Sequence, residues 1–298
     1  MKKINWSAYN KELINRGSLT IWFNLEDKSQ WYSEEEPKRK GRRHIYSWIA
    51  IELITILRFR FGLTLRGVQG FAQSILKLMD IEVDVPNYST LGRRMAKMDI
   101  SIIQSSRKSG PLHVAIDSTG LKVYGDGEWK VKIHGRSKHR TWRKLHLAVD
   151  TKTNEILSAV LTTNDFKDNQ VFQDTLEGVK NIKAVSADGA YDSKDCYAFA
   201  KKEKFKLIAP PRKNAKISSR GSKKARDKTI REVRTLGRKT WKKKTKYHRR
   251  SLSETAMSRL KMVMGDKLRS RNFDNQASEA FMKCKILNKM KTPKFFVD

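Results

Sequence analysis

Residues 113–124 read His-Val-Ala-Ile-Asp-Ser-Thr-Gly-Leu-Lys-Val-Tyr, and here the apolar pattern of the chain changes from helical to strand-like. The apolar run Val-Ala-Ile ends at Asp117, which is followed by the polar residues Ser118 and Thr119. A carboxylate in a core strand is costly to bury unpaired, so it needs hydrogen-bond donors or a metal ion. The stretch therefore predicts a buried strand that presents an acid.

The segments downstream of this strand alternate between strand-like and helical periods. The predicted strands cover residues 143–149, 155–161, 182–187 and 205–209, and the predicted helices cover residues 168–179 and 194–204. The first strands are expected to pair as antiparallel neighbours. Antiparallel strands followed by helix, strand, helix and strand predict an α/β domain with a mixed sheet flanked by helices. By analogy, this order is that of a ribonuclease-H-like fold.

A second acid occurs in a similar setting. Asp188 follows the apolar strand Ala-Val-Ser-Ala at 184–187 and precedes Gly189-Ala-Tyr191. An isolated aspartate at a strand end is more often a turn or capping residue, but here two such strands occur in one predicted sheet. Asp192 competes for the same role, and its place before Ser193 favours capping of the following helix.

A third acid lies in Tyr247-His-Arg-Arg-Ser-Leu-Ser-Glu-Thr-Ala-Met-Ser-Arg-Leu-Lys261. The apolar residues recur at helical steps, at Leu252, Ala256, Leu260 and Val263. Four polar residues project within roughly 60° of one another on the other side, namely Tyr247, Arg250, Glu254 and Lys261. An alternative is that Ser251 and Glu254 form a capping box, in which Glu254 only satisfies backbone donors.

The remainder of the chain divides into regions of different composition. We expect a basic arm over residues 1–43, which ends in the cationic run 37–43, and a helical region over 44–108. The helical periods cover residues 45–57, 65–79 and 89–98. The last carries Arg93, Arg94 and Lys97, as in a helix-turn-helix that binds DNA, although a plain helical packing module has the same pattern.

The catalytic domain is expected over residues 109–298. A basic insertion, 211–246, precedes the helix that carries Glu254, and a final amphipathic helix covers 275–290. The insertion reads either as a disordered linker or as a clamp on DNA, and we expect it to be mobile alone and ordered on DNA.

The charge balance indicates a polyanionic partner. The chain of 298 residues has 64 Lys and Arg against 31 Asp and Glu, a net charge of +33. The longest apolar run, 45–57, is too short to cross a bilayer and contains Glu52, so we expect nucleic acid rather than a membrane as partner. The N-terminus has no secretory signal pattern, and Cys196 and Cys284 have no zinc-ligand spacing, which fits a cytoplasmic protein with small core cysteines.

The spacing of Tyr247, Arg250, Glu254 and Lys261 resembles the Y-(2)-R-(3)-E-(6)-K signature of DDE transposases of the IS4/IS5 type. Further segments extend the resemblance to the IS5 family, near the IS903-like group, over nearly the whole chain; these are residues 115–122, 186–192 and 208–214. The resemblance implies that Asp117, Asp188 and Glu254 form a DDE triad. It also implies that Tyr247, Arg250 and Lys261 contact terminal phosphates, and we assign Arg212 and Lys213 to phosphate binding as well.

Three carboxylates gathered from two strands and a helix form an oxygen-only site suited to two Mg²⁺ ions, with Mn²⁺ as a substitute. Such a site activates a water or a 3′-hydroxyl for attack on phosphorus. The expected function is an insertion-sequence transposase of the bacterial cytoplasm, associated with the nucleoid. It binds double-stranded DNA at transposon ends and at the target, as a homodimer or higher oligomer. Two alternatives remain, a non-catalytic DNA-binding protein and a metal-dependent nuclease without strand transfer.

Overall fold

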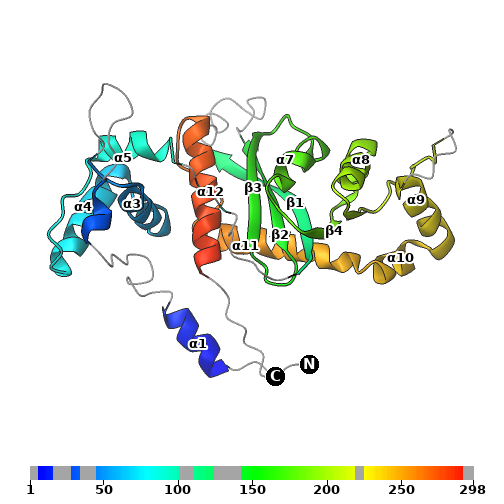
Figure 1. Cartoon of the computed structure of the whole chain (residues 1–298), viewed down its shortest axis with the longest axis horizontal. Helices are drawn as coiled ribbons and strands as arrows, with labels where there is room; N and C mark the ends of the chain where they lie inside the picture. The colour runs from blue at the N-terminus through cyan, green and yellow to red at the C-terminus, as the bar shows by residue number, and fades with distance from the viewer. Residues whose placement is uncertain are drawn as a thin grey trace, which may run out of the picture. The chain divides into compact units, whose positions relative to one another are not determined.

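The computed structural model describes residues 6–15, 28–33, 45–98, 100, 102, 110–123, 142–218 and 225–290. The chain divides into two compact units, one formed by Met1–Ile100 with Asn272–Asp298 and the other by Ser101–Arg271 (Figure 1). The segment Gly-Asp-Gly at 125–127, whose sequence predicts a hairpin turn, lies outside the described residues, as do the cationic run 37–43 and the insertion residues 219–224.

The larger unit is built on a mixed β-sheet. Its described strands are β1 (Leu112–Val123), β2 (Trp142–Asp150), β3 (Ile156–Thr163), β4 (Ile182–Ser186), β5 (Lys206–Ile208) and β6 (Lys267–Leu268). They follow the order β3-β2-β1-β4-β5, and β6 pairs with β1. The β1–β2 and β2–β3 pairs are antiparallel, whereas β4 runs parallel to β1 and to β5. The expected mixed sheet is confirmed, and β1 lies at its centre.

Helices flank this sheet. They include α7 (Phe172–Leu176), α8 (Lys194–Lys202) and α11 (Ser251–Met264), with the 3₁₀ turns η2 (Asp168–Gln170), η3 (Gly189–Tyr191) and η4 (Tyr247–Arg250). Val114 and Ile116 of β1 share one apolar core with Phe172 of α7 and Tyr197 of α8. Because successive strand residues point to opposite faces, Ala115 and Asp117 face away from that core. On their side, α11 contacts β1 and β2, and Figure 1 shows it passing behind the strands.

The face of α11 that is buried differs from the predicted one. The buried residues are Ser253, Ala256, Met257 and Leu260, whereas Val263 is exposed. The buried face therefore includes Met257, which does not belong to the predicted apolar stripe of Leu252, Ala256, Leu260 and Val263. The helix also begins later than expected, because Tyr247 and Arg250 lie in η4.

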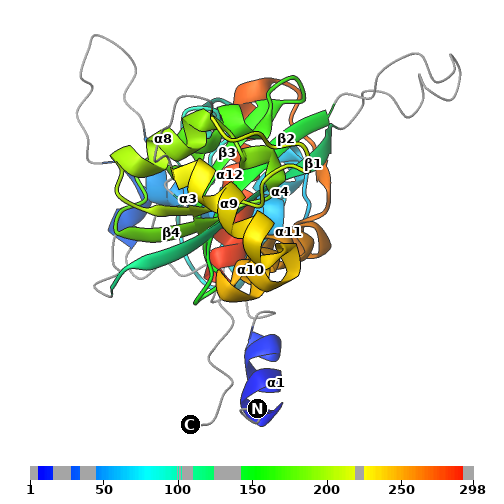
Figure 2. The ribbon, with the colours of Figure 1, turned by 90° about the vertical axis from the view of Figure 1, so that its right-hand side faces the viewer.

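The basic insertion forms two helices, α9 (Ala225–Leu236) and α10 (Arg238–Lys244), which lie side by side in Figure 2. The described residues of the insertion are therefore helical, and the expectation that the segment is mobile alone and ordered on DNA stays a prediction. Trp241 of α10 is 2% exposed and packs against Ala184 and Ile208 of the sheet. One large aromatic side chain thus anchors a segment whose composition is otherwise strongly cationic.

The smaller unit is helical in its described part. It contains α1 (Trp6–Asn15), η1 (Lys28–Trp31), α3 (Trp48–Arg60), α4 (Leu65–Leu78), α5 (Tyr88–Met95) and α12 (Phe273–Lys289). Helix α3 contacts α4, α5 and α12, and most of its residues are buried. Side chains of Ser47, Thr64, Asn87 and Asn272 cap α3, α4, α5 and α12, respectively. Trp31, within the expected arm, is fully buried, and its indole nitrogen donates to the Asp84 carbonyl at 2.7 Å.

The last helix lies in a different unit from the one we had assigned. We placed residues 275–290 in a catalytic domain ending at 298, but α12 packs on α3, and Lys285 pairs with Glu52 at 2.8 Å. The reason is that buried residues such as Ala280, Cys284 and Leu287 complete the core of the smaller unit. Both cysteines are buried, which agrees with the expected core positions. No helix in the described part of the chain is long and apolar enough to cross a bilayer.

Candidate active site

The register of the sheet brings Asp117 and Asp188 to neighbouring positions. Strands β1 and β4 are parallel, and Ala115 pairs with Ser186. Each aspartate lies two residues beyond this pair, at the same end of the two strands. Asp117 is still within β1, whereas Asp188 follows β4 and caps η3, with its Oδ1 accepting from the Ala190 amide at 2.8 Å. The fold therefore places the first two predicted acids side by side.

Tight packing fixes the backbone at Asp188. An added Cβ on Gly189 would lie 3.3 Å from the carbonyl oxygen of Pro210, which is closer than most such contacts. A side chain at position 189 would therefore crowd the carbonyl oxygen of Pro210. This explains the Asp-Gly pair that follows β4.

The third predicted acid is linked to Asp117 through Arg250. The Arg250 Nη1 donates to Oδ2 of Asp117 at 2.7 Å, and Nη2 pairs with Oε1 of Glu254 in the first turn of α11. Glu254 is 52% exposed and Asp117 is 17% exposed. The predicted capping box does not form, because Glu254 pairs with this arginine and the Ser251 hydroxyl donates to the carbonyl of His248.

The pKa of Asp117 reflects its neighbours. Burial raises this pKa, and the negative charges of Asp188 and Glu254 raise it further, while the Ser118 amide and Arg250 act in the opposite direction. Asp188 and Glu254 therefore both lie within electrostatic reach of Asp117. As the side chains stand, no group of three Asp, Glu, His or Cys residues in the described part of the chain is arranged to hold a metal ion.

The predicted phosphate-binding residues are distributed over a wider area. Tyr247 is hydrogen-bonded to Arg250, and burial raises the pKa of Tyr247. Lys261 lies seven residues after Glu254, about 10 Å further along α11. Arg212 and Lys213 are exposed after β5, and within the described residues their side chains form no hydrogen bond or ion pair with Asp117, Asp188 or Glu254.

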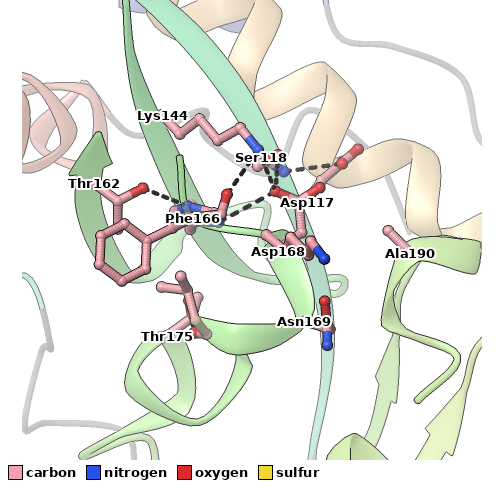
Figure 3. A network of polar contacts seen from close by, with 12 residues as sticks. Asp117, Ser118, Lys144, Thr162, Phe166, Asp168, Asn169, Thr175 and Ala190 are labelled. Atoms are coloured by element: carbon pink, nitrogen blue, oxygen red, sulfur yellow. Dashed lines mark hydrogen bonds and ion pairs between the residues drawn. The ribbon is translucent and has the colours of Figure 1, made fainter. Parts of the chain in front are cut away.

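A cluster next to the acids was missed by the sequence analysis. Asp168, at the start of η2, accepts from the Ser118 hydroxyl at 3.0 Å and from Lys144 Nζ at 3.4 Å (Figure 3). Its Oδ1 also lies 3.9 Å from Nδ1 of His146, which is fully buried. The only available signal was the placement of an acid shortly after a strand, which is common in loops.

Asp192 does not cap α8, which corrects its predicted role. Ser193 caps that helix, with its hydroxyl accepting from the Cys196 amide at 3.2 Å. Asp192 instead accepts from Arg226 Nε at 2.8 Å and from Nη2 at 2.9 Å. The pair joins the insertion helix α9 to the sheet domain, and its carboxylate is fully buried.

Comparison with known families agrees with this arrangement. A profile described as a transposase DDE domain matches residues 108–289, which is more than half of the chain and includes all three predicted acids. The chain belongs to the family of transposases with a DDE domain. A second profile of the same description matches residues 14–126 of this transposase. The two matches agree with the IS4/IS5 type that the sequence motif indicated.

Among solved structures, this transposase is similar to a piggyBac transposase in a synaptic complex with hairpin DNA, determined by cryo-electron microscopy. The similarity covers 97% of this chain and 76% of the other, at 12% sequence identity and a TM-score of 0.44.

Proposed function

We propose that this transposase binds the terminal inverted repeats of its own element, cleaves the transferred strands by metal-assisted hydrolysis and joins the 3′ ends to target DNA. We further propose that it belongs to the IS5 family, near the IS903-like group, with a ribonuclease-H-like catalytic domain. Asp117, Asp188 and Glu254 would be its catalytic acids. The observation that supports this most strongly is the β1–β4 register, which sets Asp117 beside Asp188, together with Arg250, which links Asp117 to Glu254.

The acids have the chemistry that a pair of Mg²⁺ or Mn²⁺ ions requires. All three are hard oxygen donors, and Arg250 already places a positive charge between Asp117 and Glu254. A metal ion on Asp117 would compete with this guanidinium, which donates to Oδ2 of that residue. When bound, such ions activate a water or a 3′-hydroxyl and stabilise the leaving oxygen. Ser118 keeps Oδ1 of Asp117 oriented through its amide, at 2.9 Å.

DNA binding is supported by the charge of the chain and by the cations around the acids. The net charge of +33 favours binding to the phosphates of DNA. We propose that Tyr247, Arg250 and Lys261 hold the terminal phosphates, and that Arg212 and Lys213 bind the strand near β5. Arg250 would exchange its carboxylate partners for phosphate when DNA and metal enter.

Two copies of the chain would bring two transposon ends together, because each end needs its own set of acids. We propose a homodimer or higher oligomer in the synaptic complex, acting in the bacterial cytoplasm on the nucleoid.

A strand-transfer assay tests this function. End-bearing DNA, Mg²⁺ and a target plasmid are incubated with the full chain and with Asp117→Asn, Asp188→Asn and Glu254→Gln. We expect each variant to lose cleavage and joining by at least about a hundredfold while retaining DNA binding in a gel-shift experiment. Glu203→Gln, an exposed acid at the end of α8, serves as the matched control and should behave as wild type.

The same assay separates the competing functions. Cut ends that never join to target DNA would indicate a nuclease. Cleavage that is absent, or unaffected by all three substitutions, would indicate a DNA-binding protein without this active site.

A further inference from the structure

We infer that Asp168 is a positioning residue for the active site, which acts on Asp117 through Ser118. This inference rests on the proposed function, because it concerns the metal-binding geometry of Asp117. Figure 3 shows the contacts on which it depends, from β1, β2 and the turn that follows β3.

The first step is the position of Ser118 in β1. Ile116 and Ser118 point to the face covered by α7 and α8, and Ile116 belongs to the core on that side. Asp117 points to the opposite face, where Arg250 meets it. Ser118 connects the two faces, since its backbone amide donates to Oδ1 of Asp117 at 2.9 Å while its hydroxyl donates to Asp168 at 3.0 Å.

The second step is that Asp168 is itself held in place. Lys144 Nζ donates to the carbonyl oxygen of Phe166 at 2.9 Å and to Oδ1 of Asp168 at 3.4 Å, so it fixes the turn and its carboxylate together. His146 lies opposite Ser118 in the β1–β2 register, and its Nε2 is 3.0 Å from the Thr162 hydroxyl. The Asp168 side chain is only 22% exposed, which limits its rotamers.

The consequence is a defined orientation for the Asp117 carboxylate. With Oδ1 occupied by the Ser118 amide, only Oδ2 is directed toward Arg250 and Glu254. Removing the Asp168 carboxylate would free the Ser118 side chain and loosen this part of β1. Residues that orient metal ligands in this way typically change metal affinity or activity by about 10- to 100-fold when they are substituted.

The test measures Mn²⁺ binding to the full-length protein by electron paramagnetic resonance, alongside thermal unfolding. Asp168→Asn and Ser118→Ala should each weaken Mn²⁺ binding about tenfold. Ser118→Thr, which keeps the hydroxyl, should bind as wild type does. Asp174→Asn, an exposed acid on α7, is the matched control. If Asp168→Asn does not fold, the comparison of Ser118→Ala with Ser118→Thr tests the inference.

A double variant separates a positioning role from direct ligation. If Asp168 acts through Asp117, the variant Asp117→Asn/Asp168→Asn binds Mn²⁺ no more weakly than Asp117→Asn alone. Further weakening in the double variant would make Asp168 a ligand and overturn the inference. If Asp117→Asn weakens Mn²⁺ binding but Asp168→Asn and Ser118→Ala do not, this inference is overturned and the proposed function is not. Unchanged affinity in Asp117→Asn would instead count against the proposed function.

Discussion

Arg250 donates from Nη1 to Oδ2 of Asp117 at 2.7 Å, and its other terminal nitrogen pairs with Glu254. One guanidinium thus neutralises two of the three proposed metal ligands while DNA and metal are absent. The same side chain is predicted to bind a terminal phosphate. Arg250 therefore links the two carboxylates, and in the proposed reaction it would compete with metal for both of them.

The first prediction follows from this competition. Arg250→Ala removes a positive charge and a hydrogen-bond partner from Asp117, so Mn²⁺ affinity in the absence of DNA should increase on the order of tenfold. Binding of end DNA should weaken, because a phosphate contact is lost. Isothermal titration with Mn²⁺ and a gel-shift titration measure the two effects separately.

Arg249→Ala provides the control for this prediction. Arg249 is the adjacent residue, but its Nη1 lies 3.1 Å from Nδ1 of His113 rather than against an acid. Its removal should leave Mn²⁺ affinity unchanged. Equal Mn²⁺ affinity in Arg250→Ala and wild type would show that the guanidinium does not compete with metal.

The second prediction concerns the anchor of the basic insertion. Arg226→Ala leaves the fully buried carboxylate of Asp192 without its charged partner, and we expect the free energy of unfolding to fall by about 3 kcal/mol. Cleavage within α9 by an added protease should become faster in the same variant. Arg231→Ala removes an exposed arginine from the same helix and should leave both measurements unchanged. Urea unfolding and limited proteolysis provide the readouts, and equal stability of the two variants would contradict the assignment.

The third prediction is a pH dependence. Burial lowers the pKa of His113 below its ordinary value of 6.5, and the neighbouring Arg249 lowers it further, against the effect of Asp150. The folded protein therefore binds fewer protons at this site than the unfolded chain. The contribution of His113 to stability is fully present above pH 6.5, and it decreases as the pH falls from 6.5 through the lowered pKa.

Unfolding by urea at several pH values tests whether the contribution of His113 to stability decreases as the pH falls. His113→Gln cannot titrate, so its stability should fall less than that of wild type between pH 7.5 and about pH 5. The pKa of His146 is also lowered by burial, but His146 is present in both proteins, so the difference between their curves reports His113. A wild-type protein that becomes relatively more stable at acidic pH would contradict the expected direction.

The sequence predicted the sheet well because its strands carry clear local signals. Asp117 and Asp188 each end an apolar run, and the helix and strand alternation gave the order of the elements. The coarse position of Glu254 followed from a helical period. None of these features depends on a contact between distant residues.

The sequence could not predict interactions that depend on distant partners. Asp192 binds Arg226, which lies 34 residues away, and local spacing suggested only a helix cap. Trp241 anchors an insertion whose composition is typical of disorder. Asp168 accepts a hydrogen bond from Ser118, which lies 50 residues earlier in the chain, and no short sequence motif predicts such a contact. In each case the fold, rather than the neighbouring sequence, determines the partner.

The last prediction separates two adjacent arginines of α5. A helix-turn-helix would direct both toward DNA, whereas a plain packing module would not. Arg94 is 7% exposed, donates to the Tyr46 carbonyl at 2.9 Å and stacks over the Trp48 ring at 4.0 Å. Arg93 is exposed. Arg94→Ala should therefore lower the free energy of unfolding by about 2 kcal/mol through the lost packing and hydrogen bond.

Arg93→Ala should leave stability unchanged and weaken DNA binding through one lost phosphate contact. The slope of log affinity against log salt should then decrease by about one. Fluorescence anisotropy with end DNA at several salt concentrations, combined with thermal unfolding, distinguishes the two variants. An unchanged salt slope in Arg93→Ala would favour a purely structural role for α5, because its exposed arginine would then contribute no ionic contact to the DNA.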